Sequence, residues 1–298
     1  MPSLIDIRRR IRSVKNTQQI TKAMKMVSAS KLRRAQDRVI GGRPYAALLE
    51  RMLANIAAAA SDDERTAENP LLAVREEKRI LLVLVTSDKG LAGAFNSNLI
   101  KGVQQFLGQH SGAEAILETI GRKGRDFFRK RGARISGEYT NLSAKAQYAD
   151  TAAIARKAME MFRREEIDAV YLIFNEFKSV ASQKLTVKRV LPVALPERPA
   201  SKDGQAPADR ETPTDYIYEQ PPAEILAALL PRYVEVEFYR ALAESTASEH
   251  AARMMAMETA TSNASDMIDR LTLYMNRVRQ ASITKEIIEV VSGAAAAE

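Results

Sequence analysis

The stretch TSDKGLAGAFN, residues 86–96, has the residue types that come closest to phosphate chemistry. It follows an apolar, β-rich run and precedes a predicted helix, an arrangement that can aim free main-chain N–H groups at a phosphate. It contains Gly90 and Gly93, with Lys89 before them. The P-loop pattern needs a Lys after its second glycine, and the dinucleotide pattern needs three glycines. The stretch fits neither pattern, so we interpret its glycines as a tight strand-to-helix turn with close helix–sheet packing.

Few other side chains could do chemistry. The 298 residues include no cysteine, which excludes disulfides, thiolate metal sites and thiol redox switching. The two histidines, His110 and His250, have no metal-ligand spacing, and no Gly-x-Ser-x-Gly elbow or catalytic triad accompanies them. We therefore predict no catalytic residue, no metal and no cofactor, and we interpret the chain as a protein that is not an enzyme.

Residues 75–196 alternate between short apolar strands and helices. We predict strands at 79–86, 115–120, 133–139, 169–174 and 184–191, and helices at 95–107, 124–131 and 148–164. The last strand alternates in polarity, which is typical of an exposed edge. This succession predicts the α/β class, with a Rossmann-like domain and a mainly parallel sheet.

Two long helices are predicted on either side of that domain, at 1–60 and within 215–298. Residues 197–214 between the domain and the second helix are rich in Pro, Asp, Gly and Ala, and predict a flexible loop. The second helix is expected from about Pro222, with Pro231 marking a kink or a helix start. At 1.5 Å per residue it would be about 100 Å long, longer than the core of a globular domain of this size.

Apolar spacing pairs the two helices. The first helix has one stripe at Ile7, Ile11 and Val14 and another at Ile20, Met24 and Val27. The second helix has a seam with alternating spacings of three and four, formed by Met257, Ala260, Ala264, Met267, Leu271, Tyr274, Val278 and Ala281. Such a heptad seam predicts a long antiparallel two-helix coiled coil of the N- and C-terminal helices.

The charge distribution agrees with that pairing. Residues 1–40 contain 11 Lys and Arg against 2 Asp and Glu, whereas residues 221–298 contain 7 against 11. Opposite charge favours contact between the two ends and leaves surplus positive charge outside for an acidic partner. An alternative interpretation is a basic coiled coil that binds nucleic acid, but no aromatic residues are interleaved with the basic ones. The longest apolar run, 80–85, is too short to span a membrane.

Several long segments resemble one known family. NTQQITKAMKMVSASKLRRAQ (16–36), ASEHAARMMAMETATSNA (247–264) and RQASITKEIIEVVSGAAA (279–296) are similar to segments of the gamma subunits of F-type ATP synthases. TSDKGLAGAFN resembles that family's strand-to-helix turn, and DYIYEQP (215–221) its segment before the long C-terminal helix. The resemblance covers the chain in order, and the absence of cysteine fits a bacterial rather than a plastid member.

This resemblance implies a rotor shaft that couples proton-driven rotation of the membrane c-ring to conformational cycling of the beta catalytic sites. The implied partners are three alpha and three beta subunits around one gamma, the epsilon subunit and the c-ring, without nucleic acid. The implied location is the cytoplasmic face of the bacterial inner membrane, peripheral to it and without a transmembrane segment. Residues implied to contact beta are Met24, Lys25, Lys31, Arg33, Arg34, Arg279, Gln280 and Thr284, and those implied to lie near the c-ring and epsilon are Tyr216, Tyr218 and Glu219.

Overall fold

The computed structural model describes residues 3–61, 63–195 and 218–295. Its elements, in chain order, are α1 (Leu4–Ala59), α2 (Glu64–Ala67), the 3-10 helix η1 (Pro70–Leu72), β1 (Arg79–Val85), α3 (Phe95–Gln109), β2 (Glu114–Ile120), α4 (Arg122–Arg129), β3 (Ile135–Tyr139), α5 (Leu142–Lys145), α6 (Tyr148–Arg163), β4 (Ala169–Phe177), β5 (Gln183–Leu191) and α7 (Pro222–Ala295). The predicted strands and helices of the α/β region are all present, with ends within three residues of those expected.

The five strands form one sheet in the order β3-β2-β1-β4-β5. The first four are mutually parallel, and β5 is antiparallel to β4 at the edge. This confirms a mainly parallel sheet with an edge strand at the end of the domain. The central strand β1 is apolar from Ile80 to Val85 because both faces of a parallel sheet are covered, and Ile80 to Leu84 are fully buried.

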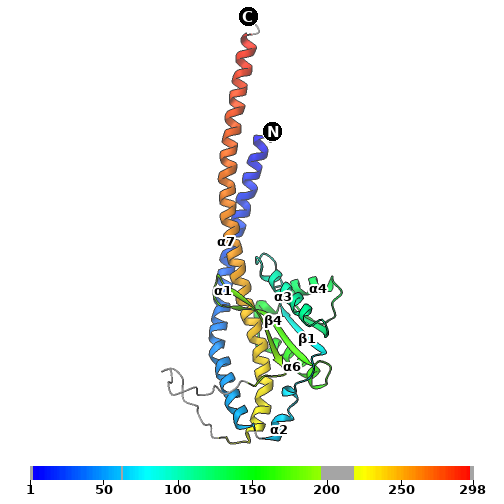
Figure 1. Cartoon of the computed structure of the whole chain (residues 1–298). Coiled ribbons are helices and arrows are strands. Elements are labelled where there is room, and N and C mark those ends of the chain that lie inside the picture. The colour runs from blue at the N-terminus through cyan, green and yellow to red at the C-terminus, as the bar shows by residue number, and fades with distance from the viewer. Residues whose placement is uncertain (1–2, 62, 196–217, 296–298) are drawn as a thin grey trace, which may run out of the picture. The chain divides into compact units, whose positions relative to one another are not determined.

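Helices cover the sheet on two faces (Figure 1). On one face, Ile80, Leu82 and Leu84 of β1 pack in a cluster with α3 and with Phe128 of α4. On the other face, Leu81, Val83 and Val85 join a larger cluster with α6, the end of α1 and the first part of α7. The alternation of side chains along β1 therefore divides one strand between two cores.

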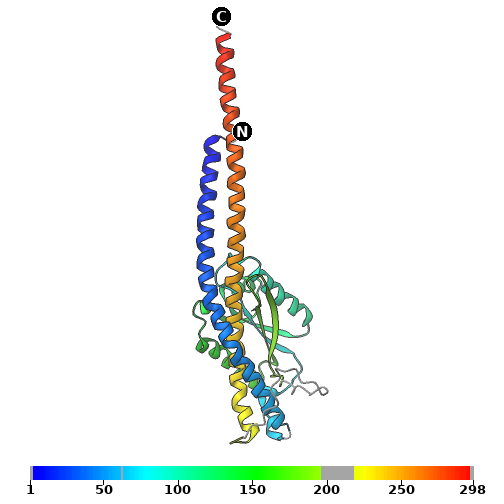
Figure 2. The same ribbon diagram turned by 90° about the vertical axis from the view of Figure 1, so that its left-hand side faces the viewer.

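The chain separates into two compact units. One comprises residues 31–252 and holds the sheet with the adjoining parts of α1 and α7, and we call it the α/β unit. The other comprises residues up to 30 together with those from 253 onward, and we call it the coil unit. In the coil unit α1 and α7 run antiparallel, and α7 continues past the N-terminal end of α1 (Figure 2).

The seam of the coil unit differs from the predicted one. Ile7 is buried, and Ile11 and Val14 are half-buried, as expected. The second stripe is wrong at two of its three positions, because Ile20 and Val27 are 60% and 56% exposed, while Thr21 and Ser28 are buried in their place. Thr21 and Thr261 face each other across the seam with their hydroxyl oxygens 2.8 Å apart.

The α7 side of the seam is shifted in the same manner. Met267 and Tyr274 are exposed, whereas their neighbours Ile268 and Met275 are half-buried. One series with alternating spacings of four and three is buried or half-buried throughout: Met257, Thr261, Ala264, Ile268, Leu271, Met275, Val278 and Ser282. Five of the eight predicted positions, Met257, Ala260, Ala264, Leu271 and Val278, are buried or half-buried, whereas Met267, Tyr274 and Ala281 are exposed and the residue after each of them is half-buried.

The prolines interrupt neither long helix. Pro44 lies inside α1 and Pro231 inside α7. Helix α7 begins at Pro222, a position where the missing N–H of proline has no helical partner to lose. Pro231 is therefore not a helix start.

Candidate functional site

The crevice that binds nucleotides in doubly wound folds is the first place to look for a site. The chain runs from β1 outward to β2 and β3, then returns to β4 on the other side of β1. The carboxyl ends of β1 and β4 therefore flank the point where the strand order reverses, which is where such sheets bind their ligands.

Helix α7 occupies this crevice. The Ser245 hydroxyl donates a hydrogen bond to the main-chain oxygen of Val85, the last residue of β1, at 3.1 Å. The Ser248 hydroxyl donates to the main-chain oxygen of Asn175 in β4 at 3.0 Å. Both serines are buried. The long helix is thus packed against the strand ends where a nucleotide would otherwise lie.

The loop after β1 is also occupied by the protein itself. Asp88 accepts hydrogen bonds from the main-chain N–H of Arg122, the first residue of α4, and from that of Asn141. The neighbouring Ser87 is fixed by two further hydrogen bonds, because its N–H donates to the Asn96 side chain and its hydroxyl donates to the Lys89 carbonyl. An internal carboxylate therefore takes the place at the helix N-terminus that an anion could occupy.

The structure requires glycine, through a positive φ or a lack of room for a Cβ, at positions that only partly match those predicted from the sequence. Gly93 has a φ of +54°, as a tight turn requires, but Gly90 has room for a Cβ and an ordinary φ. The close approach occurs after β2, where a Cβ on Gly121 would lie 2.2 Å from the main-chain oxygen of Thr86. Gly124 is less tight, because a Cβ there would lie 2.9 Å from side-chain atoms of Leu84 and Thr86, and its N–H donates to the Thr86 hydroxyl oxygen at 2.9 Å. These glycines hold α4 against β1 and serve packing.

Residues predicted to contact beta fall into separate groups. In the coil unit, Met24 is half-buried, and Lys25 forms an ion pair with Glu258 across the seam. Arg279 lies 21 residues beyond Glu258 on α7, which at 1.5 Å per residue is about 30 Å along the helix. The structure does not bring these two groups together.

The remaining residues predicted to contact beta are exposed on their helices. On α7, Arg279, Gln280 and Thr284 are exposed, and the Thr284 hydroxyl donates to the Gln280 carbonyl. In the α/β unit, Lys31, Arg33 and Arg34 are exposed on α1.

The residues predicted near the c-ring and epsilon lie just before α7. Tyr218 is half-buried and packs against the larger core cluster, and Glu219 is exposed. Tyr216 lies outside the described residues. Tyr218 therefore has a packing role in addition to any contact with a partner.

The residues that fill the crevice were not predicted from the sequence. Asp88, Ser245 and Ser248 follow no motif for binding a ligand, and the only available signal was a pair of small hydroxyl residues three apart on a long helix. Within the described ranges no group of His, Asp or Glu could hold a metal ion. None of the helices so described is long and apolar enough to cross a membrane.

These features define a class of protein, a coiled-coil stalk that carries a Rossmann-like domain with its ligand crevice filled from within. The family model described as ATP synthase matches residues 3–297. The ATP synthase gamma chain of Solibacter usitatus is 70% identical over 298 residues, covering 100% of both chains. That of Pelotomaculum thermopropionicum is 48% identical over 298 residues, again covering 100% of both. The chain belongs to the ATP synthase gamma-chain family.

Solved structures show the same architecture. The central stalk and c-ring structure of the Tetrahymena thermophila mitochondrial ATP synthase contains a chain with 27% identity and a TM-score of 0.59, covering 81% of this chain and 99% of that chain. A chain of the Euglena gracilis mitochondrial enzyme in rotational state 3 has 19% identity and a TM-score of 0.65, covering 98% and 94%. The second likeness is one of fold. No comparison supports the nucleic-acid-binding alternative.

Proposed function

We propose that this chain is the central rotor shaft of an F-type ATP synthase, coupling rotation of the membrane c-ring to ATP synthesis, and ATP hydrolysis to the reverse rotation. Its family membership and its likeness to a chain of a central-stalk structure support this proposal. Coupling by rotation requires a shaft whose contacts differ with angle, so that each catalytic site prefers a different conformation in turn.

The observation that carries the proposal is the unpaired end of α7. Every residue from 283 to 292 is exposed in the isolated chain, and they include the large apolar side chains Ile283, Ile287, Ile288, Val290 and Val291. An isolated helix of this length is marginally stable in water, and an apolar surface of this kind marks a site of contact with another protein. A surrounding sleeve of subunits would supply that contact.

The partners of the shaft follow from the same proposal. Three alpha and three beta subunits surround one copy of this chain, and the beta subunits contact Met24, Lys25, Lys31, Arg33, Arg34, Arg279, Gln280 and Thr284. The epsilon subunit and the c-ring contact the region of Tyr216, Tyr218 and Glu219. The complex lies on the cytoplasmic face of the bacterial inner membrane, and this chain is peripheral to that membrane.

The chain itself does not catalyse the reaction in this proposal. The filled crevice and the internal carboxylate at the α4 N-terminus support a non-catalytic role, because at these two places groups of the chain itself occupy the positions where a nucleotide and its phosphate would bind. The nucleotide is bound and turned over by the neighbouring subunits.

Co-expression with the alpha and beta subunits tests the proposal. We expect one copy of this chain per six alpha and beta subunits, and no ATP hydrolysis or DNA binding at moderate salt by the isolated chain. Truncation at about Arg279 should weaken assembly or coupling, because it removes the exposed end of α7. Nucleotide turnover by the purified chain alone would contradict the proposal.

A further inference from the structure

Helix α7 is attached to the sheet by buried carboxylates as well as by apolar packing. Glu235, Glu237 and Glu244 are all buried, although glutamate is rarely buried unless it is paired. Each accepts a charged partner from another element: Arg156 of α6, Lys188 of β5 and Arg43 of α1, respectively. One helix is thereby held from three directions within the α/β unit.

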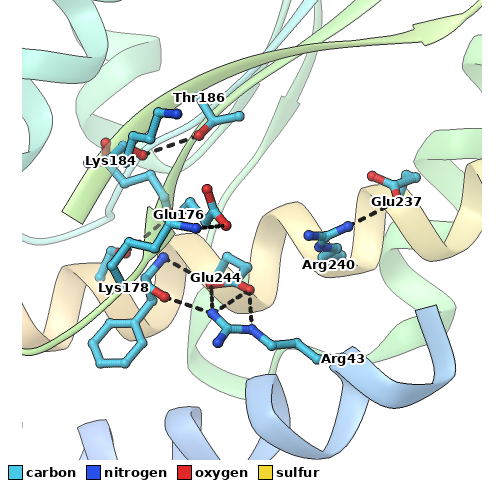
Figure 3. Close-up of polar contacts among 11 residues, drawn as sticks. Arg43, Glu176, Lys178, Lys184, Thr186, Glu237, Arg240 and Glu244 are labelled. Carbon is cyan, nitrogen blue, oxygen red and sulfur yellow. Dashed lines mark hydrogen bonds and ion pairs between the residues drawn. The ribbon is translucent and has the colours of Figure 1, made fainter. Parts of the chain in front are cut away.

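Glu244 makes the most directional of these contacts (Figure 3). One of its carboxylate oxygens accepts the main-chain N–H of Phe177 at 2.9 Å. Its carboxylate also accepts from Nε and Nη2 of Arg43, at 3.1 and 3.0 Å. Arg43 Nη2 donates in addition to the main-chain oxygen of Phe177 at 2.7 Å. Side chains from two helices therefore hydrogen-bond to both the N–H and the carbonyl of one strand residue. We call Arg43, Phe177 and Glu244 the joint.

The joint extends the hydrogen bonding of the sheet. Strand β4 pairs with β1 from Ala169 to Ile173, and the remaining residues of β4, up to Phe177, extend beyond the end of this pairing. There Ser248 takes the carbonyl of Asn175, and the joint takes both main-chain groups of Phe177. At this end of β4, side chains of α1 and α7 thus make the main-chain hydrogen bonds that a neighbouring strand would otherwise make.

Directional contacts of this kind fix the position of the two helices along β4, which apolar packing alone does not. Hydrophobic burial has no preferred direction, so it resists separation of two surfaces more than it resists sliding. Charge-assisted hydrogen bonds to a guanidinium fork have a narrow geometry. The Glu244 side chain is 1% exposed and the Arg43 side chain is 43% exposed, so the carboxylate is shielded from water while the guanidinium is partly solvated.

We propose that the joint makes the sheet turn together with α1 and α7, so that torque passes between the helices and the α/β domain without slip. The inference rests on the proposed rotor function and goes beyond it by naming the residues that carry the load. Arg43 and Glu244 are positioning residues, because they act on coupling through Phe177 and touch no substrate.

The assembled enzyme in membrane vesicles provides the first test. ATP hydrolysis and ATP-driven proton uptake are measured on the same preparation for Glu244→Gln, which keeps the shape of the side chain but loses its charge. We expect hydrolysis within about twofold of the unmodified enzyme and proton uptake per ATP lowered about threefold, because a neutral amide in place of the carboxylate weakens the bonds from Arg43 and from the Phe177 N–H. An unchanged ratio of uptake to hydrolysis would overturn the proposal.

A destabilised control separates torque from general stability. Leu99 is fully buried in the cluster around α3, away from the joint. Leu99→Ala should lower the melting temperature at least as much as Glu244→Gln but leave the ratio of proton uptake to hydrolysis unchanged. An equal loss of ratio in both variants would reduce the joint to an ordinary stabilising contact.

A distance measurement on the full chain tests the joint independently of rotation. Because the chain has no cysteine, Asp37→Cys on α1 and Lys130→Cys after α4 provide two unique, exposed labelling sites in the α/β unit. Glu244→Gln should broaden the distribution of spin-label distances, and an unchanged width would contradict the joint. If the unmodified enzyme showed no coupled proton uptake, the rotor proposal would fail while this measurement still decided whether the joint holds the sheet.

Discussion

The coil unit and the α/β unit distribute polar and apolar side chains in opposite ways. In the coil unit, Thr21 and Ser28 lie inside the seam while Ile20 and Val27 face outward. In the α/β unit, the apolar side chains of β1 are buried, and the buried carboxylates Glu118 and Glu237 are paired with Lys157 and Lys188. The coil unit therefore places small polar residues inside its seam and large apolar residues outside it, whereas the central strand of the α/β unit encloses its apolar residues.

The difference reflects what each unit must contact. Small polar residues in a seam let two helix backbones approach closely, but they bury little apolar surface. The large residues left outside are then available for another protein. A sheet covered on both faces gains its stability internally, so its outer surface does not need to bind anything to stay folded.

The most severe test of the comparison is in the α/β unit. Gly121→Ala should lower the free energy of unfolding by about 4 kcal/mol, because Gly121 has a φ of +98° and an added Cβ would lie 2.2 Å from the Thr86 oxygen. Urea unfolding followed by circular dichroism measures the change. Gly90→Ala is the matched control and should cost less than about 0.5 kcal/mol, since it has space and no left-handed φ. Equal effects would show that the tight approach of α4 is not maintained in solution.

The next largest effect concerns a buried carboxylate. Asp168 accepts the main-chain N–H of Arg79 at 2.8 Å and its guanidinium at 3.0 Å. Burial opposes the charged form, but the bonds from Arg79 outweigh it and hold the pKa of Asp168 below its usual range. Asp168→Asn should therefore cost about 2 kcal/mol at pH 7.

The pH dependence of that cost has a definite sign. A carboxylate with a lowered pKa stabilises the folded state above its unfolded pKa, and this contribution is lost as pH falls through the folded pKa. The difference in unfolding free energy between the unmodified chain and Asp168→Asn should shrink as pH falls below about 4. A difference that stayed constant down to pH 2 would exclude this origin.

The seam of the coil unit should respond more weakly. Thr21→Ala removes a buried hydroxyl that faces Thr261, and we expect a loss of about 1 kcal/mol. Amide hydrogen exchange in residues 257–268 would then accelerate about fivefold. Ile20→Ser, one residue away on the exposed side, should change the exchange rate by less than twofold, since solvent already surrounds Ile20. Faster exchange with Ile20→Ser than with Thr21→Ala would show that Ile20 lies in the seam, as expected from the sequence.

The smallest effect is expected at the end of α7. Truncation after Ser282 removes residues that are exposed in the isolated chain, so its free energy of unfolding should change by less than about 0.5 kcal/mol. Truncation after Ala264 is the control and should destabilise the coil unit, because it removes half-buried seam residues such as Ile268 and Leu271. A large loss after the first truncation would mean that the end of α7 is held by this chain itself.

Local pattern was sufficient for the elements and for the order of the fold. Short apolar runs, and an alternating run for β5, predicted each strand of the sheet, and helical composition predicted two long helices, although Pro231 was expected to mark a kink or a helix start. The seam was harder to place, since hydrophobicity favours Ile20 over the buried Thr21 and does not separate Met267 from the half-buried Ile268. Where apolar side chains serve an external partner, the internal face of a helix is no longer its most apolar face.

The sequence by itself determined the class of the fold, the two long helices and the absence of a nucleotide-binding pattern, because each depends on neighbouring residues. The tertiary structure alone decided what fills the crevice and what holds the sheet to the helices. Ser245 and Glu244 meet β1 and β4 across 160 and 67 residues of sequence, respectively. Their hydrogen bonds arise from the packing of a distant helix, which no local spacing encodes. The glycines after Thr86 therefore belong to a nucleotide-type turn whose ligand crevice is closed by the protein's own shaft.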